Sequence, residues 1–505
     1  MGKSATRTGK PATPRCAFRL LGLALILLAL ALTSTAEALA ADYGWFTQIS
    51  GTTESLNSVA FSDSSHGWAV GDSGTVLATT DGGVTWKKQT SGTTASLTSV
   101  SFLDDATHGW AVSGNGTVIS TTDGGASWQT TNTGFTLTLL NDIAFSDSVH
   151  GWIVGRHGLI LTTTDGGAHW YAQSSGSTQD LRAVAVLDSD HACAAGGTGY
   201  DSDTEHVLIT ADGGIAWSPR RALIDAYEPM WEDVAYPDAS HIWVVGGRGV
   251  GRASMDGGAT WENQSLDFTQ INLSPTAVTF SDADNGWVVA GEDFSDYIYA
   301  TKDGGAHWYQ QYSSFMAGGP LNAVAFPDSS HGWAVGDNGT IIATISGGYG
   351  PAPTIGWFLP NSGPVGSLVT LNGTNLADTV EVAFNGVPAT SFAAASDSGL
   401  TATVPVGAST GPITVTTPAG IATTADFVVP GPTAPGFTPT SGAAGTSVTL
   451  TGTGFTGATS VAFNGTSATS FSVVSGTQIT ATVPTGATTG PIAVITPAGT
   501  ATSAA

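Results

Sequence analysis

The stretch His66–Trp86, HGWAVGDSGTVLATTDGGVTW, decides the fold because much of the chain repeats it. An Asp-Gly-Gly turn followed by a tryptophan occurs six times, with tryptophans 42 to 47 residues apart. A phrase related to HGWAVG precedes each copy, and a seventh, at His331, leads to TISGG, which has lost the aspartate. Each unit divides into four short β-rich segments, such as LNSVAFSD, GWAVG, TVLATT and WKKQTSG. This period and four strands per unit predict propeller blades.

The two ends of the repeat region predict how the ring closes. The seventh unit lacks its final tryptophan strand, whereas YGWFTQISGTT, around Trp45, copies the TWKKQTSGTT that follows the first Asp-Gly-Gly turn. Trp45 is therefore predicted to supply the missing strand, which leaves no open sheet edge. We expect an all-β chain in which residues 41–350 form a seven-bladed β-propeller.

The Asp-Gly-Gly turns are predicted to be structural rather than catalytic. The carboxylate can accept backbone N–H groups, the glycines permit positive φ, and the tryptophan can pack over the hairpin. Six copies also argue against a catalytic role, because an active site needs one constellation. The residues to which we assign this structural role are Asp81, Trp86, Asp123, Trp128, Asp165, Trp170, Asp212, Trp217, Asp256, Trp261, Asp303 and Trp308.

Histidine recurs in a turn of six units, at His66, His108, His150, His191, His241 and His331. The symmetry of a propeller keeps equivalent positions apart, so these side chains should not meet at metal-bond distances of about 2 Å. The acidic stretches at 201–203 and 293–296 lack the ligand count and spacing of a calcium loop. We therefore expect no metal and no cofactor.

Residues 1–40 are predicted to be a signal peptide. A basic leader precedes the apolar run Leu20–Leu32, and Ala38-Leu39-Ala40 fits the small-x-small cleavage rule. The apolar run is short for a membrane span, although an uncleaved anchor remains the alternative. We expect a secreted or cell-envelope protein with no transmembrane span after cleavage.

Composition limits the partners of the chain. The 505 residues carry a formal net charge of −25 and only 14 lysines and arginines, several of them in the leader. Such an acidic chain repels phosphate backbones, which excludes nucleic acid as a partner. Cleavage would leave Cys193 alone, so we expect no internal disulfide. A monomer with a protein or glycan partner outside the cytoplasm is the expectation.

Arginine placement points to a binding surface. Every arginine after the leader lies between residues 156 and 252, around the two longest interruptions of the repeat, 198–206 and 224–233. Long loops on a rigid ring often bind partners, and arginine and aromatic residues are common anchors. The alternative is that these arginines only balance local acids. The candidate partner-binding residues are Arg156, Arg220, Arg221, Arg248, Arg252, Tyr227 and Trp231.

Beyond Gly350 the chain holds two copies of a different unit, related by a constant offset of 79 residues. Alternating β-branched segments and Gly, Pro and Asn-Gly turns predict two immunoglobulin-like β-sandwiches. We place them at 351–430 and 431–505. The second copy stops one residue short of the partner of Phe427, so its last strand is expected to be incomplete.

These motifs resemble two known families. The repeated HGWAVG and TTDGGxTW phrases are similar to BNR/Asp-box propellers, most closely the photosystem II assembly and stability factors. That resemblance implies a seven-bladed, non-catalytic propeller that binds protein, with an arginine-rich surface toward a client in photosynthetic members. The C-terminal copies, with VTLNGTNL, VAFNG and TGPI, resemble IPT/TIG domains.

Three functional hypotheses remain after this comparison. The first is a non-enzymatic scaffold, with the propeller as recognition platform and the sandwiches as spacers or adhesion modules. The second is an assembly factor for a membrane complex. The third is a glycan-binding or glycoside hydrolase propeller, because sialidases and xyloglucan-type hydrolases also contain Asp-boxes. A hydrolase needs two carboxyl groups about 5 to 10 Å apart, and nothing singles out such a pair among Glu205, Glu228, Glu232 and Asp233.

Overall fold

The computed structural model describes residues 44–135, 139–197, 207–220, 230–247, 249–264, 273–292, 295–315 and 319–505. These residues form strands, turns and loops, with three short 3₁₀ helices, η1 (Asp72–Gly74), η2 (Arg156–Gly158) and η3 (Asp337–Gly339). The all-β prediction is therefore confirmed. The chain divides into two compact units, Met1–Tyr349 and Gly350–Ala505.

Within the described residues of the first unit, the strands pair into seven four-stranded antiparallel sheets, which we call blades one to seven. Blades one to three are β2 (Leu56–Phe61), β3 (Gly67–Gly71), β4 (Val76–Thr79), β5 (Lys87–Lys88); β6 (Leu97–Phe102), β7 (Gly109–Ser113), β8 (Thr117–Thr121), β9 (Gln129–Asn132); and β10 (Leu140–Phe145), β11 (Gly151–Gly155), β12 (Ile160–Thr163), β13 (Tyr171–Gln173). Blades four to six are β14 (Leu181–Val186), β15 (His191–Gly196), β16 (Val207–Ala211), β17 (Ser218–Arg220); β18 (Trp231–Ala235), β19 (Ile242–Gly246), β20 (Val250–Ser254), β21 (Glu262–Gln264); and β22 (Ser274–Phe280), β23 (Gly286–Glu292), β24 (Ser295–Thr301), β25 (Tyr309–Phe315). Blade seven is β26 (Leu321–Ala325), β27 (Gly332–Gly336), β28 (Ile341–Thr344) and β1 (Phe46–Gln48).

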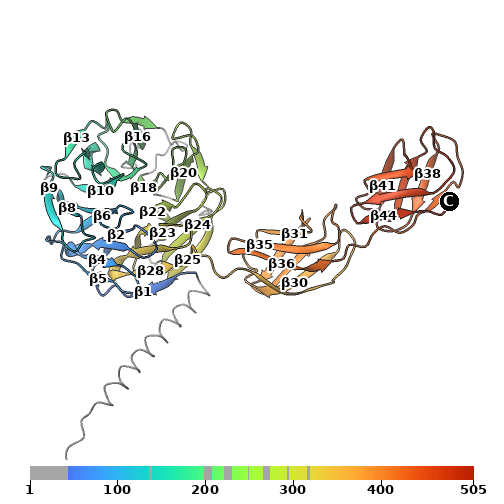
Figure 1. The fold of residues 1–505 in the computed structure, drawn as a ribbon, viewed down its shortest axis with the longest axis horizontal. Helices are drawn as coiled ribbons and strands as arrows, with labels where there is room; N and C mark the ends of the chain where they lie inside the picture. The colour runs from blue at the N-terminus through green and yellow to red at the C-terminus, as the bar shows by residue number, and fades with distance from the viewer. Residues whose placement is uncertain are drawn as a thin grey trace, which may run out of the picture. The chain divides into compact units, whose positions relative to one another are not determined.

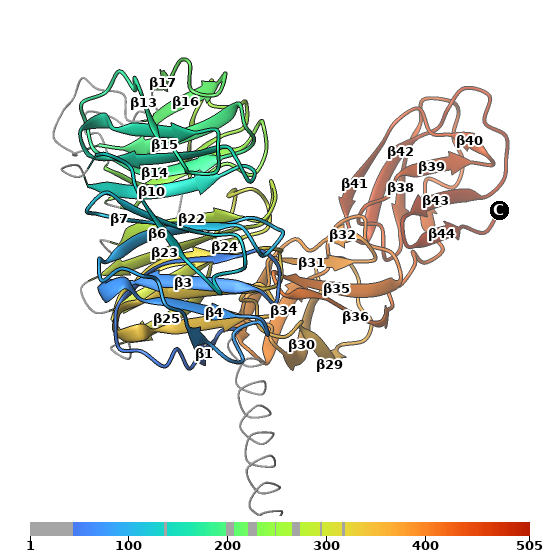
Figure 2. The same cartoon turned by 60° about the vertical axis from the view of Figure 1, so that its left-hand side comes forward.

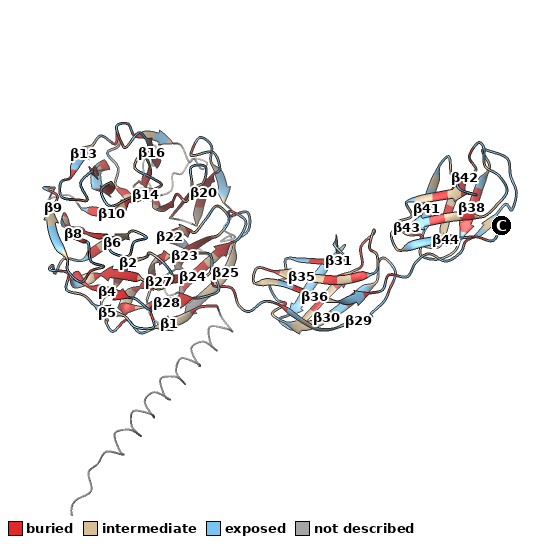
Figure 3. Ribbon diagram, in the orientation of Figure 1, coloured by how far each residue is buried: buried red, intermediate tan, exposed pale blue. Residues whose placement is uncertain are grey.

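The blades form a closed ring. The first strand of each blade contacts the first strands of its two neighbours, and β26 of blade seven contacts β2 of blade one. Figure 1 looks onto this ring, and Figure 2 shows the same sheets from a turned direction. Buried residues concentrate in the strands, and exposed residues in the turns (Figure 3).

The N-terminal strand β1 completes blade seven. It pairs antiparallel with β28, with Phe46 opposite Ala343 and Gln48 opposite Ile341. Trp45 packs edge-on against Phe326 of blade seven, at 5.8 Å between ring centroids and 80° between planes. Trp86 packs in the same way on Phe61 in blade one, at 5.9 Å and 86°. Trp45 therefore occupies the place of the tryptophan that the seventh repeat lacks.

Aromatic stacks join neighbouring blades. The ring of Phe61 in blade one lies flat on Trp333 of blade seven, with centroids 3.5 Å apart and planes 9° apart. A Cβ atom added to Gly67, which stands opposite Phe61 in the pairing of β2 with β3, would overlap the Phe61 ring. The same Phe–Gly pairing recurs in blades two, three and six. In blade seven a Cβ atom added to Gly332 would overlap the ring of Phe326 in the same way. The glycine of HGW is thus required by the phenylalanine that faces it.

Blades four and five replace both members of this pair. Val186 stands opposite Ala192 in blade four. In blade five, Tyr236 and Ile242 occupy the corresponding sequence positions. In blade four, loss of the glycine therefore accompanies loss of the aromatic ring, as the steric argument requires. Blade five keeps an aromatic ring at Tyr236, which packs with Ile242 in one buried cluster.

The second unit consists of two β-sandwiches, each built from two four-stranded sheets. The first contains the sheets β29 (Thr354–Leu359), β30 (Leu368–Thr374), β34 (Gly399–Thr403), β33 (Phe392–Ser396), and β32 (Val387–Pro388), β31 (Glu381–Phe384), β35 (Gly411–Thr417), β36 (Gly420–Phe427). The second contains β37 (Gly436–Thr438), β38 (Ser447–Thr451), β42 (Gln478–Thr482), β41 (Phe471–Ser475), and β40 (Thr466–Ser467), β39 (Ser460–Phe463), β43 (Ile492–Thr496), β44 (Gly499–Thr502). The last strand, β44, has four residues where its counterpart β36 has eight.

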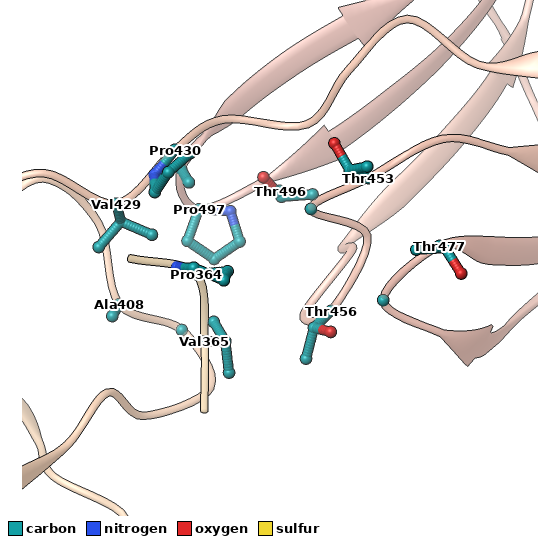
Figure 4. A pocket seen from close by; sticks show the side chains of 14 residues that line it. Pro364, Val365, Ala408, Val429, Pro430, Thr453, Thr456, Thr477, Thr496 and Pro497 are labelled. Carbon is teal, nitrogen blue, oxygen red and sulfur yellow. The ribbon is translucent and has the colours of Figure 1, made fainter. Parts of the chain in front are cut away.

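A pocket of about 340 Å³ lies within this second unit. Apolar side chains of both sandwiches line it, among them Val365, Val429 and Pro497, together with hydroxyl groups such as that of Thr456 (Figure 4). Val429 also belongs to the buried core of the first sandwich.

Candidate functional site

Each Asp-Gly-Gly turn is held by a small hydrogen-bond network. In blade one, Asp81 Oδ1 accepts the Thr85 backbone N–H and the Thr79 hydroxyl, both at 2.8 Å, and Oδ2 accepts the Thr85 hydroxyl at 2.7 Å. The Thr79 Oγ1 atom in turn accepts the N–H of Gly83 at 2.8 Å. Gly82 and Gly83 have φ of 68° and 82°, a region that disfavours other residues. The carboxylate is thus committed to the turn.

The same turns also bind adjacent blades together. The indole of Trp333 in blade seven donates to the carbonyl oxygen of Gly82 at 3.2 Å. The Gln48 amide also donates to the Gly82 oxygen, at 2.9 Å, and its Oε1 accepts the Trp86 indole N–H at 3.0 Å. Gln89 and Gln173 make the same pair of contacts one and three blades further on. Gln48, which lies on β1, therefore links blade seven to blade one.

Hydrogen bonding keeps these carboxylates ionised. The backbone N–H and hydroxyl of Ser127 hold the pKa of Asp123 below its usual value. In blade five the Thr260 hydroxyl and backbone N–H lower the pKa of Asp256 to about 2. A carboxylate with a lowered pKa is a poor general acid at neutral pH.

The recurring histidines lie in a second type of structural turn. In blade one, Asp63 Oδ1 accepts the backbone N–H groups of Ser65 and His66, while Oδ2 contacts the His66 ring Nδ1 at 2.9 Å. The histidine ring contacts the equivalent aspartate in the turns of His108, His150, His191, His241 and His331. Among the described residues, no group of three or more His, Cys, Asp or Glu side chains is placed to hold a metal ion.

Two of the described arginines each lie beside a carboxylate near the first strands of blades four and five. Arg156, in η2 of blade three, lies 3.6 Å from the Asp180 carboxylate, next to the start of blade four. Arg182, on β14, forms a 3.0 Å ion pair with Glu232 on β18 and contacts the Met230 sulfur. We call these five residues the arginine cluster; they lie where the first strands of blades four and five begin. Arg182 was not among the candidates predicted from sequence.

Two predicted surface residues are corrected by the structure. Trp231 is 2% exposed, because it opens β18 and faces the core between blades four and five. Arg252, in the middle of β20, is 3% exposed. Neither can anchor a partner at the surface.

The remaining candidates fall into two groups. Arg220 ends β17, the last strand of blade four, and pairs with Val207. Three other candidates lie outside the described residues: Arg221, Tyr227 and Arg248. The arginine surface of the described residues is therefore smaller than the sequence predicted, and it rests on Arg156 and Arg182.

Two buried carboxylates lie on the innermost strands of the ring. Asp142 was not identified from the sequence, and Asp233 was given no specific role. Asp142, on β10, accepts the N–H of Val184 in blade four at 2.7 Å. Asp233, on β18, accepts the N–H of Val278 in blade six at 2.8 Å. Each therefore bridges to the next blade. Burial raises the pKa of both, and that of Asp233 reaches about 8 despite the Val278 N–H, with the Asp142 charge contributing.

A signal for these carboxylates exists in the repeat. The third residue of the first strand is Ser58, Ser99, Asp142, Ala183, Asp233 and Ala323 in blades one to five and seven. Ser58 and Ser99 accept an N–H from the next blade, as the aspartates do. An acid at a position otherwise held by small residues marks a special role.

Comparisons with known proteins agree with this architecture. The family described as photosynthesis system II assembly factor YCF48 matches residues 38–132, 134–218 and 223–321, which make up more than half of the chain. The IPT/TIG domain matches residues 353–428 and 432–504. No curated protein matches the chain in sequence.

The solved structures similar to this chain include two types of protein. YCF48 bound to D1 peptide and YCF48 from Cyanidioschyzon merolae are each 22% identical, cover 60% of this chain and 95% and 98% of theirs, and have TM-scores of 0.48 and 0.49. The GH74 enzyme from Niastella koreensis is 13% identical, with 91% of each chain covered and a TM-score of 0.50. At these identities, the similarity concerns the fold alone. The family match shows that the chain belongs to the photosynthesis system II assembly factor YCF48 family, with two IPT/TIG domains after its propeller.

Proposed function

We propose that this protein is a non-enzymatic scaffold outside the cytoplasm whose propeller binds a segment of a client protein at the arginine cluster. The observation that carries the proposal is the position of Arg156, whose side chain is 53% exposed at the edge of blade three. An exposed guanidinium presents several N–H donors in a planar fork, which suits carboxylates and backbone carbonyls of a polypeptide. Membership of a family described as assembly factors supports a protein client.

The ion pairs of the cluster favour selective binding over general attraction. Arg156 faces Asp180, and Arg182 faces Glu232, so each cation already has an acidic partner. A client must therefore offer a carboxylate in the right place to compete with Asp180. The net charge of −25 further disfavours nonspecific acidic partners.

The test is capture of partners from the native cell envelope with the full chain. The Arg156→Glu variant should lose a protein that the wild type retains, whereas reversal of the exposed Lys87 on β5 should not. Equal capture by Arg156→Glu and wild type would contradict the proposal.

The location outside the cytoplasm has its own test. N-terminal sequencing of the exported protein should give a start at Ala41.

An assembly role is the more specific form of the same proposal. It predicts that subunits of one membrane complex recur among the captured proteins, whereas a general adhesion scaffold would capture unrelated ones. Among the described residues, no helix has the length and apolar character needed to cross a membrane.

Glycoside hydrolysis is the rival function, and one observation favours it. The pKa of Asp233, about 8, is suitable for a general acid, and Asp142 lies close enough to raise it. Against this, both oxygens of Asp233 accept backbone N–H groups, from Val234 and Val278. Turnover of any glycan that is abolished by Asp233→Asn would establish the rival.

A further inference from the structure

The first IPT/TIG domain exposes an apolar row on one sheet. Along β29 and β30, alternate residues face the core, and Val369 and Leu371 are fully buried. The opposite face carries Trp357, Leu359 and Leu368, which are 49%, 60% and 60% exposed. Leu359 stands opposite Thr370 on the neighbouring strand. We call Trp357, Leu359 and Leu368 the tryptophan row.

The second IPT/TIG domain provides an internal comparison. Its residues at the offset of 79 are Gly436, Thr438 and Ser447, all exposed. Its core-facing residues remain apolar, with Val448 and Leu450 buried at the places of Val369 and Leu371. The sandwich fold therefore does not require the tryptophan row. A clustered exposed apolar group that the fold does not need indicates a binding surface.

The rest of this face determines the chemistry of its partner. The four strands β29, β30, β34 and β33 read TIGWFL, LVTLNGT, GLTAT and FAAAS, and contain no charged residue. Thr370, Thr401 and Thr403 supply hydroxyl groups next to the tryptophan row. A polyanion such as nucleic acid would find no cation here, on a chain of net charge −25. The partner should be uncharged.

We propose that this face of the first IPT/TIG domain binds a neutral polysaccharide, with a sugar ring stacked on Trp357. A pyranose ring has an apolar C–H face that can cover an indole and a rim of hydroxyl groups that can hydrogen-bond threonines. A stable protein partner normally covers about 800 Å² around an apolar centre. The large exposed apolar side chains of this face lie on the edge strand β29 and its neighbour β30, and a row of this width suits a narrow chain better.

The experiment uses the full chain and a set of neutral polysaccharides, namely cellulose, xyloglucan, mannan, starch and chitin, with alginate as the anionic comparison. Binding is measured by co-sedimentation and affinity electrophoresis. At least one neutral polymer should bind, and Trp357→Ala should weaken it about tenfold or more, from the lost apolar burial. Ile421→Ala, on the other sheet and 64% exposed, is the matched control and should bind as wild type does.

A transplant tests the same inference in the opposite direction. The triple variant Gly436→Trp, Thr438→Leu and Ser447→Leu should create a second site and increase the amount bound. Circular dichroism of each variant checks that the domain is folded. Binding unaffected by Trp357→Ala would overturn the inference, as would no binding to any neutral polymer. A dimer of the chain that Trp357→Ala dissociates would assign the row to a second copy instead. None of these outcomes depends on the arginine cluster.

Discussion

The contact between Phe61 and Gly67 allows a direct test of how the blades are built. Phe61 is fixed between Trp333, on which it stacks at 3.5 Å, and Trp86, which meets its edge. A Cβ atom at position 67 would overlap the Phe61 ring, which the two tryptophans hold at its face and at its edge. Gly67→Ala should therefore destabilise the propeller by overpacking, which costs about 1–3 kcal/mol.

The second half of the test removes the ring. Phe61→Val alone should cost about 2–4 kcal/mol, from lost burial and the cavity left behind. Blade four holds valine and alanine at these two places, as Val186 and Ala192. In the double variant Phe61→Val with Gly67→Ala the new methyl group enters the vacated space. It should therefore be no less stable than Phe61→Val alone, a coupling of about 1–3 kcal/mol.

Urea unfolding followed by tryptophan fluorescence is the assay. Fourteen of the 15 tryptophans precede Gly350, so the signal reports the propeller. Ala192→Gly in blade four is the control, because no phenylalanine faces that position. It should cost only about 1 kcal/mol from backbone entropy. Additive effects of Phe61→Val and Gly67→Ala would refute the steric explanation.

Three further predictions follow from buried or paired groups. The pKa of Asp256 in the folded protein is below its unfolded value near 3.8, so the carboxylate stabilises the fold fully above about pH 4 and loses this effect as the pH falls toward 2. Asp256→Asn should therefore make the free energy of unfolding depend less on pH in this acidic range. Burial raises the thiol pKa of Cys193, so in a Cys16→Ser background an alkylating reagent should label the chain only after unfolding. Arg182→Met leaves the Glu232 carboxylate, whose pKa is raised by burial, without its cationic partner. The free energy of unfolding should fall by about 1–3 kcal/mol at pH 8. The decrease should be smaller at pH 5, where Glu232 is more readily protonated.

The repeat made much of the architecture predictable. Turn chemistry is local, so the role of Asp81 follows from the residues that flank it, and the network to Thr79 and Thr85 agrees with that reasoning. The place of Trp45 also followed from sequence, because the N-terminal segment copies a strand that the seventh unit lacks.

The errors arose where long insertions hid the register. The interruption of the repeat at 224–233 predicts a loop that contains Trp231. However, WEDVAYPD aligns with LNSVAFSD and places Trp231 at the buried position of Leu56. Arg252 likewise occupies the buried position of Leu77. The ion pair of Arg182 with Glu232 joins residues 50 positions apart across two blades, and no local pattern announces it.

The central claim is that the repeats form a ring closed by the N-terminal strand. Amide hydrogen exchange of β1 and β28 tests this most directly, because closure requires the two strands to open together. We predict that the Phe46 and Gln48 region exchanges as slowly as Ile341–Thr344, and that Trp45→Ala accelerates both. Rapid exchange of β1 beside a protected β28 would contradict the closed ring.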